Sequence, residues 1–249
     1  MKIRTILVPV MLIALLIMSC GLITNTGAKV ITPSDNIISE NREVSNFNSI
    51  EFSTFGKINI MQGDGESFNI SGPDNLVPEV STVVNNGTLT IKNKENITVT
   101  SLDSMHILTF TIVVKELSSL SISGAGDVQI ETLSTPSLSI NMSGAGRLTQ
   151  NQLTTDNLHI ILSGVGGLNV SGQATQATID MSGAGGVDAK DLQIQNAKIT
   201  ISGLGGATLW VTDQLTGEIS GTGSVSYYGN PQTITNSTGL GNFKSLGSK

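Results

Sequence analysis

The sequence predicts an all-β protein built as a parallel β-solenoid (β-helix) whose rungs take about 20 residues each. Three observations predict this fold. The tetrapeptide Ser-Gly-x-Gly recurs six times in the second half of the 249-residue chain, and apolar and polar residues alternate on both sides of every copy. Helical periodicity is nearly absent, although residues 75–84 have room for one turn. A fixed period of this size is typical of stacked repeats, with one structural rung in each copy.

The spacing of the repeat is regular. Successive copies are separated by 20, 20, 19, 20 and 18 residues, and a looser Thr-Gly-Leu-Gly follows at 238–241. Positions at odd offsets from the motif serine are mostly apolar, and these lie on one face of an extended chain. They predict the interior of the solenoid, and the polar even offsets predict its outer surface. The copies begin at Ser123, Ser143, Ser163, Ser182, Ser202 and Ser220.

The two glycines of each copy also occupy odd offsets, so the alternation continues through the motif. We predict that they are inward positions where the chain bends and the interior is too narrow for a side chain. A sandwich or barrel of hairpins is the competing fold, but hairpin turns would not require the same glycine pair at the same phase in every copy. The predicted bend glycines are Gly124, Gly126, Gly144, Gly146, Gly164, Gly166, Gly183, Gly185, Gly203, Gly205, Gly221 and Gly223.

The first residues are predicted to be a targeting segment. Two basic residues precede an apolar stretch over residues 6–18, and a serine stands directly before Cys20. Residues 16–20, Leu-Ile-Met-Ser-Cys, resemble a bacterial lipobox with isoleucine where leucine is favoured. We therefore expect a lipoprotein signal peptide over residues 1–19 and a lipid on Cys20, the only cysteine of the chain. An uncleaved anchor helix and an ordinary signal peptide are the alternatives.

The mature chain would be acidic. Loss of residues 1–19 removes Lys2 and Arg4 and leaves 11 basic against 19 acidic side chains, a net charge of −8. Nucleic-acid binding needs clustered Lys and Arg, and the sequence has no such cluster, so nucleic acid is excluded as a partner. A lipid on Cys20 would hold the chain at a membrane in the cell envelope, on the periplasmic or extracellular face, without spanning it.

The chain divides into a tether and a folded part. Residues 20–40 are polar and rich in Gly, Thr and Asn, and we expect them to separate the folded part from the membrane. Short alternating runs separated by glycine-rich turns follow from residue 41. The predicted solenoid spans residues 41–246, with irregular N-terminal coils over 41–117 and the Ser-Gly-x-Gly repeats over 118–246.

A series of motifs carries a family resemblance. The first motifs are, in chain order, Arg-x-Val-x-x-Phe-x-x-Ile from residue 42, Ile-x-Ile-x-Gln-Gly-Asp from residue 58, Gly-Pro-Asp-Asn-Leu from residue 72 and Gly-Thr-Leu-Thr-Ile from residue 87. The Ser-Gly-x-Gly copies and Tyr-Gly-Asn-Pro at 228–231 follow. Together they resemble the head GIN domain family of bacterial envelope proteins, putative autotransporter adhesins. The resemblance covers about residues 41–246 and implies a β-helical, surface-attached protein.

The chain departs from this family at the repeated motif. The family typically has Ser-Gly-Ser-Gly-Asp, whereas here the third residue is Ala, Val, Leu or Thr, and only Asp127 keeps the acid. Calcium-binding solenoid repeats have nine residues and an acid in every copy, and calcium takes six or more oxygen ligands. The motif therefore predicts a structural bend and no metal site.

No catalytic residue and no cofactor are predicted. No Lys-Ser/Thr follows the Gly-x-Gly copies, which excludes a phosphate loop. His106 and His159 are the only histidines. His159 is expected beside Asp180 of the next rung, where a solvated surface pair is favoured over a catalytic one.

Trp210 and Tyr228 are the candidate binding residues. Both stand eight residues after the serine of consecutive copies, in an outward column that begins with Glu131 and includes Lys190. Stacked rungs would place the two rings about 5 Å apart. Such a pair would bind a sugar ring or a protein partner, or it would cover the C-terminal end of the solenoid, which is the favoured interpretation.

Two functions follow from the sequence. The first is a non-enzymatic envelope lipoprotein that acts as an adhesin or a structural surface scaffold. Its partners would be the membrane, through the lipid, and a surface polysaccharide or protein. The alternative is a carbohydrate-binding or polysaccharide-degrading protein on the same scaffold, because some polysaccharide-cleaving enzymes are parallel β-helices.

Overall fold

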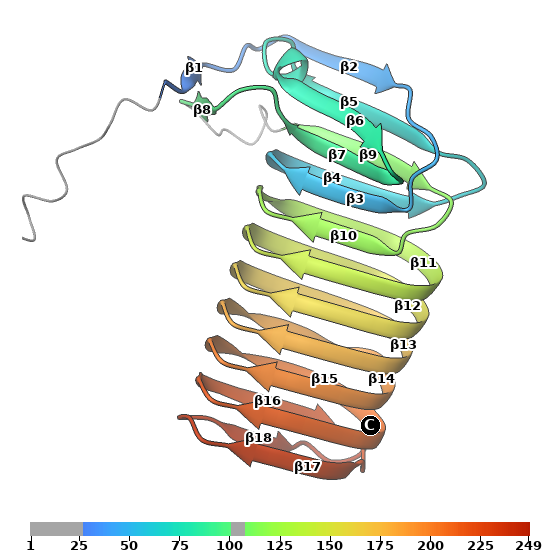
Figure 1. Cartoon of the computed structure of the whole chain (residues 1–249), viewed down its shortest axis with the longest axis vertical. Helices are drawn as coiled ribbons and strands as arrows, with labels where there is room; N and C mark the ends of the chain where they lie inside the picture. Colours follow the sequence, from blue (N-terminus) through green and yellow to red (C-terminus); the bar gives the residue numbers. More distant parts are fainter. Residues whose placement is uncertain (1–26, 101–107) are drawn as a thin grey trace, which may run out of the picture.

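A computed structural model describes residues 27–100 and 108–249, and it confirms a parallel β-solenoid with rungs about 20 residues apart. The rungs stack into a rod with N-terminal strands at one end and C-terminal strands at the other (Figure 1). The expected signal over residues 1–19, the lipidation site Cys20 and His106 lie outside the described residues.

Long strands each make almost one complete turn of the rod. Each is parallel to the next and in register with it apart from shifts at the corners, so the backbone groups bond from rung to rung along the rod axis. The long strands are β11 (Ala125–Met142), β12 (Ala145–Leu162), β13 (Val165–Met181), β14 (Ala184–Ile201) and β15 (Leu204–Ile219). The C-terminal turns are divided among β16 (Thr222–Tyr228) and β17 (Gln232–Ser237), which both pair with β15, and β18 (Asn242–Ser245), which pairs with β16.

Each rung has three sides. In β11 the alternation of buried and exposed residues is interrupted at 131–132 and at 136–137, where two successive residues are both exposed. Each interruption is a corner, and the Ser-Gly-x-Gly motif forms the third. The alternation beside the motif follows the sequence prediction, whereas the other two corners carry varied polar residues. The inward side chains of this rung are Val128, Ile130, Leu133, Thr135, Leu138, Ile140 and Met142.

The motif glycines are required by the preceding rung. The N–H of the third motif residue donates to the carbonyl of the first glycine one rung earlier, and Ala145 donates to Gly124 at 3.0 Å. A Cβ on Gly144 would overlap that same carbonyl oxygen, and all twelve predicted bend glycines have a backbone oxygen of the preceding rung in this place. The sequence predicts that a narrow interior excludes the side chain, whereas the structure shows that the neighbouring rung excludes it.

A further copy of the motif, which departs from the Ser-Gly-x-Gly pattern, stands in the first rung. Residues 53–56, Ser-Thr-Phe-Gly, connect β3 (Ser49–Ser53) to β4 (Phe55–Gln62) and lie in register with residues 123–126. Thr54 replaces the first glycine, and its carbonyl accepts the N–H of Ala125 at 2.9 Å. The strands that pair with β3 and β4 on the N-terminal side are not joined to each other by a tight corner. The Thr54 side chain therefore has room, and its hydroxyl donates to Asn93 Oδ1 at 2.5 Å.

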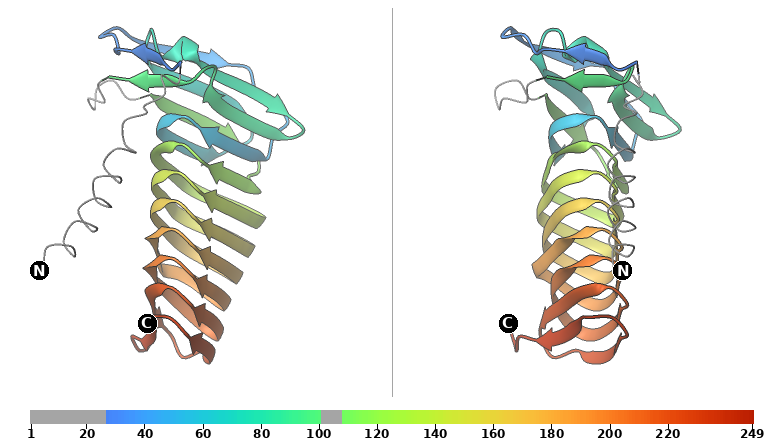
Figure 2. Two further views of the ribbon diagram at one scale, coloured as in Figure 1. Left: turned by 60° about the vertical axis from the view of Figure 1, so that its left-hand side comes forward. Right: turned by 90° about the vertical axis from the view of Figure 1, so that its left-hand side faces the viewer.

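Antiparallel strands close the N-terminal end of the rod (Figure 2). On top of the first rung, β3 and β4 pair with parallel strands, and the outermost strands then run in the opposite direction. The parallel strands are β7 (Thr88–Asn93) and β9 (Thr109–Val114). The antiparallel strands are β6 (Val80–Asn85) on β7, β5 (Ser67–Pro73) on β9 and β2 (Ile37–Arg42) on β5.

The remaining short elements connect the N-terminal end to the rod. A 3-10 turn, η1 (Val77–Glu79), lies in the segment that has room for one helical turn. β10 (Ser119–Ile122) pairs with β3 on one side and β11 on the other, and β1 (Lys29–Ile31) pairs with β8 (Ile97–Val99). Because β1 and β2 contain residues before 41, ordered strands begin inside the segment that we expected to be a tether.

We expect Gly205→Ala to destabilise the rod, because its Cβ would overlap the carbonyl oxygen of Gly185. Overpacking of this kind costs about 1–3 kcal/mol, which would lower the midpoint of urea unfolding. Gly167→Ala is the matched control, because a Cβ there meets its nearest neighbour, the Gly186 oxygen, at an ordinary 3.7 Å. Equal unfolding midpoints for the two variants would contradict the role assigned to the contact between rungs.

Candidate functional site

The third residue of each motif copy projects outward at the same corner, and these residues form a continuous row along the rod. They are direct partners from rung to rung, and Leu240 extends the row by donating its N–H to the Gly221 carbonyl at 3.0 Å. Thr222 is the one polar member. We refer to the apolar members as the apolar edge: Phe55, Ala125, Ala145, Val165, Ala184, Leu204 and Leu240.

The apolar edge is open to solvent. Val165, Leu204 and Leu240 are 63%, 62% and 85% exposed. In the rungs of Val165, Ala184 and Leu204, the next outward residue along the strand is glycine. No side chain therefore shields the edge there. Because soluble proteins rarely expose contiguous apolar surface without a use for it, the edge is a candidate interaction surface.

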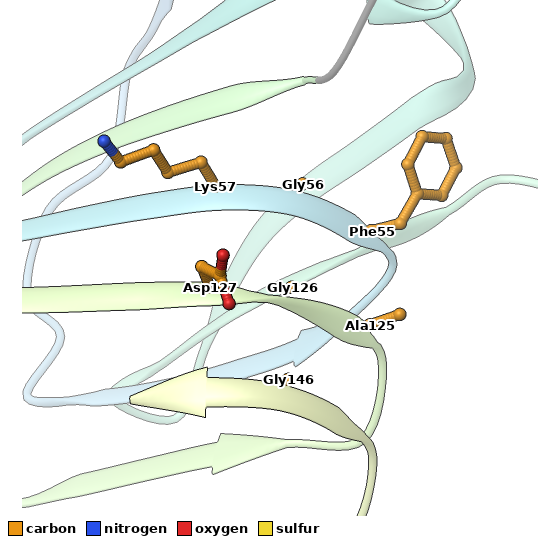
Figure 3. A pocket seen from close by; sticks show the side chains of 7 residues that line it. All are labelled: Phe55, Gly56, Lys57, Ala125, Gly126, Asp127 and Gly146. Carbon is orange, nitrogen blue, oxygen red and sulfur yellow. The ribbon is translucent and has the colours of Figure 1, made fainter. Parts of the chain in front are cut away.

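A shallow pocket of about 340 Å³ lies at the N-terminal end of the apolar edge (Figure 3). Phe55 and Ala125 project from the bends of successive rungs, and backbone at the motif glycines forms much of the wall. Lys57 and Asp127 are direct partners on the same two rungs, and Asp127 accepts the N–H of Arg147 at 3.3 Å. The pocket therefore combines an apolar wall with one cation and one anion.

Trp210 and Tyr228 are direct partners on β15 and β16, and both are half-buried. Their column differs from the predicted one, because Trp210 pairs with Gln193 of β14 and not with Lys190. β14 makes a corner at residues 190–192 that β15 omits, so the register shifts between the two rungs. The column that leads to the aromatic pair therefore consists of Thr154, Gln173 and Gln193.

Lys249 contacts the corner of β14 at residues 190–192, which has no counterpart in β15. Its ammonium donates to the Lys190 carbonyl and, at 2.6 Å, to the Asp191 carboxylate. The same nitrogen lies 4.9 Å from the centre of the Trp210 ring and 5.7 Å from that of Tyr228. The hydrogen bond from Lys249 lowers the pKa of Asp191 from its usual value of 3.8. The aromatic pair is thus partly occupied by a cation of the chain itself.

Comparison with known proteins places this rod in a family. A family model described as "putative auto-transporter adhesin, head GIN domain" matches residues 46–231. The chain belongs to the head GIN domain family. No curated protein matches the chain.

Solved structures share the fold of this head GIN domain. A putative adhesin from Bacteroides fragilis is 29% identical with a TM-score of 0.83, over 87% of this chain and 100% of its own. A putative lipid binding protein from Parabacteroides distasonis is 22% identical (TM-score 0.69), over 88% of this chain and 100% of its own. A putative adhesin from Parabacteroides merdae is 20% identical (TM-score 0.65), again over 88% and 100%. The last two likenesses concern the fold alone.

The histidine–aspartate pair that the sequence predicts lies on the surface of the head GIN domain. His159 Nε2 lies 3.2 Å from Asp180 Oδ2, with both side chains about half exposed. Within residues 27–100 and 108–249, no three His, Cys, Asp or Glu side chains are grouped so that they could hold a metal ion. In the same residues, no helix has the length and apolar character needed to cross a membrane.

The structure separates the predicted site residues into two places. The bend glycines follow one corner of the rod, and Trp210 with Tyr228 lies near its C-terminal end. Sequence reasoning missed the apolar edge, although its signal was present, because the third motif residue is apolar in five of the six copies. No sequence signal indicated Lys249, since its position depends on the corner that β15 omits.

Trp210 is the only tryptophan of the chain, so its fluorescence reports on the Lys249 contact. Asp191 has a lowered pKa, so its charged pair with Lys249 is present above pH 3.8 and is lost as pH falls through that lowered pKa. We expect the emission of the native chain to shift on acidification, and Asp191→Asn to show the acid-like spectrum already at pH 7. Asp188→Asn, which removes a partner of Lys190, is the control. A pH profile shared by the native chain and Asp191→Asn would refute the contact.

Proposed function

We propose that this head GIN domain protein is a non-enzymatic envelope lipoprotein, anchored through Cys20, that acts as an adhesin by presenting the apolar edge on a stiff rod. The observation that supports this most strongly is the edge itself. Its members stand in register over successive rungs, and Val165, Leu204 and Leu240 are mostly exposed. Membership of a family named for adhesins supports an adhesive role.

The construction of the rod suits adhesion. Each long strand is bonded to both neighbours over nearly its whole length, so the edge residues are held about 4.8 Å apart in a fixed row. A partner that binds several rungs would therefore order few protein groups on binding, which limits the entropic cost. The side chains that would make contact are short and apolar, so their desolvation is favourable.

The position of the chain ends fits an anchor at the N-terminal side. The described chain begins at residue 27, beside the antiparallel strands that close one end of the rod, and β17 and β18 lie at the other end (Figure 1). A lipid on Cys20 would then attach at the N-terminal end. The C-terminal rungs, with Leu204 and Leu240, would be the part farthest along the rod from that end.

Carbohydrate binding is the second candidate function. One observation favours it: the aromatic pair of Trp210 and Tyr228 continues a row of outward polar side chains, as sugar-binding surfaces require both ring faces and hydrogen-bonding groups. Polysaccharide degradation is not favoured by any comparable observation, since the His159–Asp180 pair is exposed and has no third group joined to it in the described structure.

We expect Val165→Ser combined with Leu204→Ser to reduce binding of displayed protein to alkyl-coated glass at least tenfold, because two large and mostly exposed apolar members of the edge become polar. Thr222→Val should strengthen binding, since it replaces the one polar side chain that interrupts the apolar edge. Val83→Ser removes a comparably exposed apolar side chain from the N-terminal end and is the matched control.

Cys20→Ala should move the protein from the membrane fraction to the soluble fraction.

Two results would contradict the proposal. Unchanged binding by the Val165→Ser/Leu204→Ser variant, or an equal loss in Val83→Ser, would remove the apolar edge as the adhesive surface. Retention of Cys20→Ala in the membrane fraction would remove the lipid anchor, whatever the outcome of the binding assay.

A further inference from the structure

We propose that a polar groove on one side of the rod binds a neutral oligosaccharide, with the sugar chain parallel to the rod axis. The groove has a volume of about 320 Å³ and crosses rungs β12 to β15. In each rung, the groove lies on the side between the two corners that the Ser-Gly-x-Gly motif does not form. This inference rests on the carbohydrate-binding candidate and is independent of the apolar edge.

Two rows of outward side chains line the groove. In the first row, Thr154, Gln173 and Gln193 are direct partners in three successive rungs. The second row follows the adjacent corner and includes Asp156 and Gln195. Strand spacing repeats these groups about every 4.8 Å along the rod, which is close to the length of one pyranose unit in an extended polysaccharide. Each rung can therefore contact one sugar unit.

The polar groups of the groove have unused hydrogen-bonding capacity. Within the described residues, the side chains of Gln173, Gln193, Gln195, Asp156 and Asp213 form no hydrogen bond to the protein. Each glutamine offers two N–H donors and one acceptor, and each carboxylate accepts several hydrogen bonds. Neighbouring hydroxyls of a sugar present donors and acceptors together, so they can pair with these groups without leaving a polar atom unsatisfied.

The charge of the groove selects against acidic ligands. Asp156 and Asp213 line it, and no Lys, Arg or His does. Two fixed carboxylates repel a uronate polymer or a phosphate group, and the excess of acidic residues over the whole chain adds to the repulsion. Hydroxyl groups carry no such penalty. A neutral sugar chain is therefore the ligand class that this lining fits.

The aromatic pair extends the first row of the groove. Gln193 is the direct partner of Trp210, and Trp210 is that of Tyr228. A sugar chain that follows the row reaches the indole ring directly after the amide of Gln193, and the apolar C–H face of a sugar packs well on such a ring. Lys249 already lies over both rings, so the last sugar unit would contact the remaining surface of Trp210 or displace the lysine.

Native gel electrophoresis of the full chain in detergent tests the inference, with soluble mixed-linkage β-glucan and α-mannan as neutral probes and polygalacturonate as the charged probe. We expect at least one neutral polysaccharide to retard the native protein, and polygalacturonate to leave its mobility unchanged. Gln173→Ala combined with Gln193→Ala should weaken retardation at least tenfold, and Trp210→Ala should weaken it less.

The matched control is Gln176→Ala combined with Gln214→Ala, because these two exposed glutamines follow the corner just outside the groove lining. It should bind as the native chain does.

Three results would overturn the proposal: absence of retardation by both neutral probes, equal retardation of the native chain and the Gln173→Ala/Gln193→Ala variant, or retardation by polygalacturonate. Equal urea midpoints of all variants exclude unfolding as the cause. Binding to alkyl-coated glass should persist in the groove variants, so the groove and the apolar edge can fail separately.

Discussion

The close approach of successive rungs at the Ser-Gly-x-Gly corner is the constraint on which the rest of the structure depends. The carbonyl that accepts an N–H from the next rung also occupies the space of a Cβ on that rung's first glycine. Glycine at this corner therefore fixes the register of the whole stack. Differences in repeat length are absorbed elsewhere, since the register shifts near residues 150–153 and 189–193 lie at another corner.

The two candidate surfaces arise from this constraint in different ways. At the regular corner, the outward residue between the glycines is free to vary, and apolar side chains there align into the apolar edge. At the irregular corner, omitted residues bring Gln193 beside Trp210 and leave a place for Lys249. The regular part of the rod thus supplies a uniform row, and the irregular part supplies the mixed polar and aromatic chemistry expected of a ligand site.

Local alternation made much of the fold predictable, and contacts distant in sequence account for the rest. The period and the inward positions beside each motif follow from residues that are close together in the chain. The copy at residues 53–56 could not be predicted from the repeat, because Thr54 replaces glycine and its partner rung comes 70 residues later. Similarly, the column of Trp210 could not be predicted by counting from the serine, since the count assumes a corner that β15 omits.

The central claim is that each Ser-Gly-x-Gly repeat is one complete rung, whose backbone pairs with the rung before it and the rung after it. Deletion of residues 144–163 removes one repeat and joins Ser143 to Gly164, which restores the motif. The account predicts a folded, shorter rod, with an unchanged β-sheet circular dichroism spectrum per residue and cooperative urea unfolding. Deletion of residues 144–153 removes half a rung and should abolish both. A one-rung deletion that unfolds like the half-rung deletion would contradict the account.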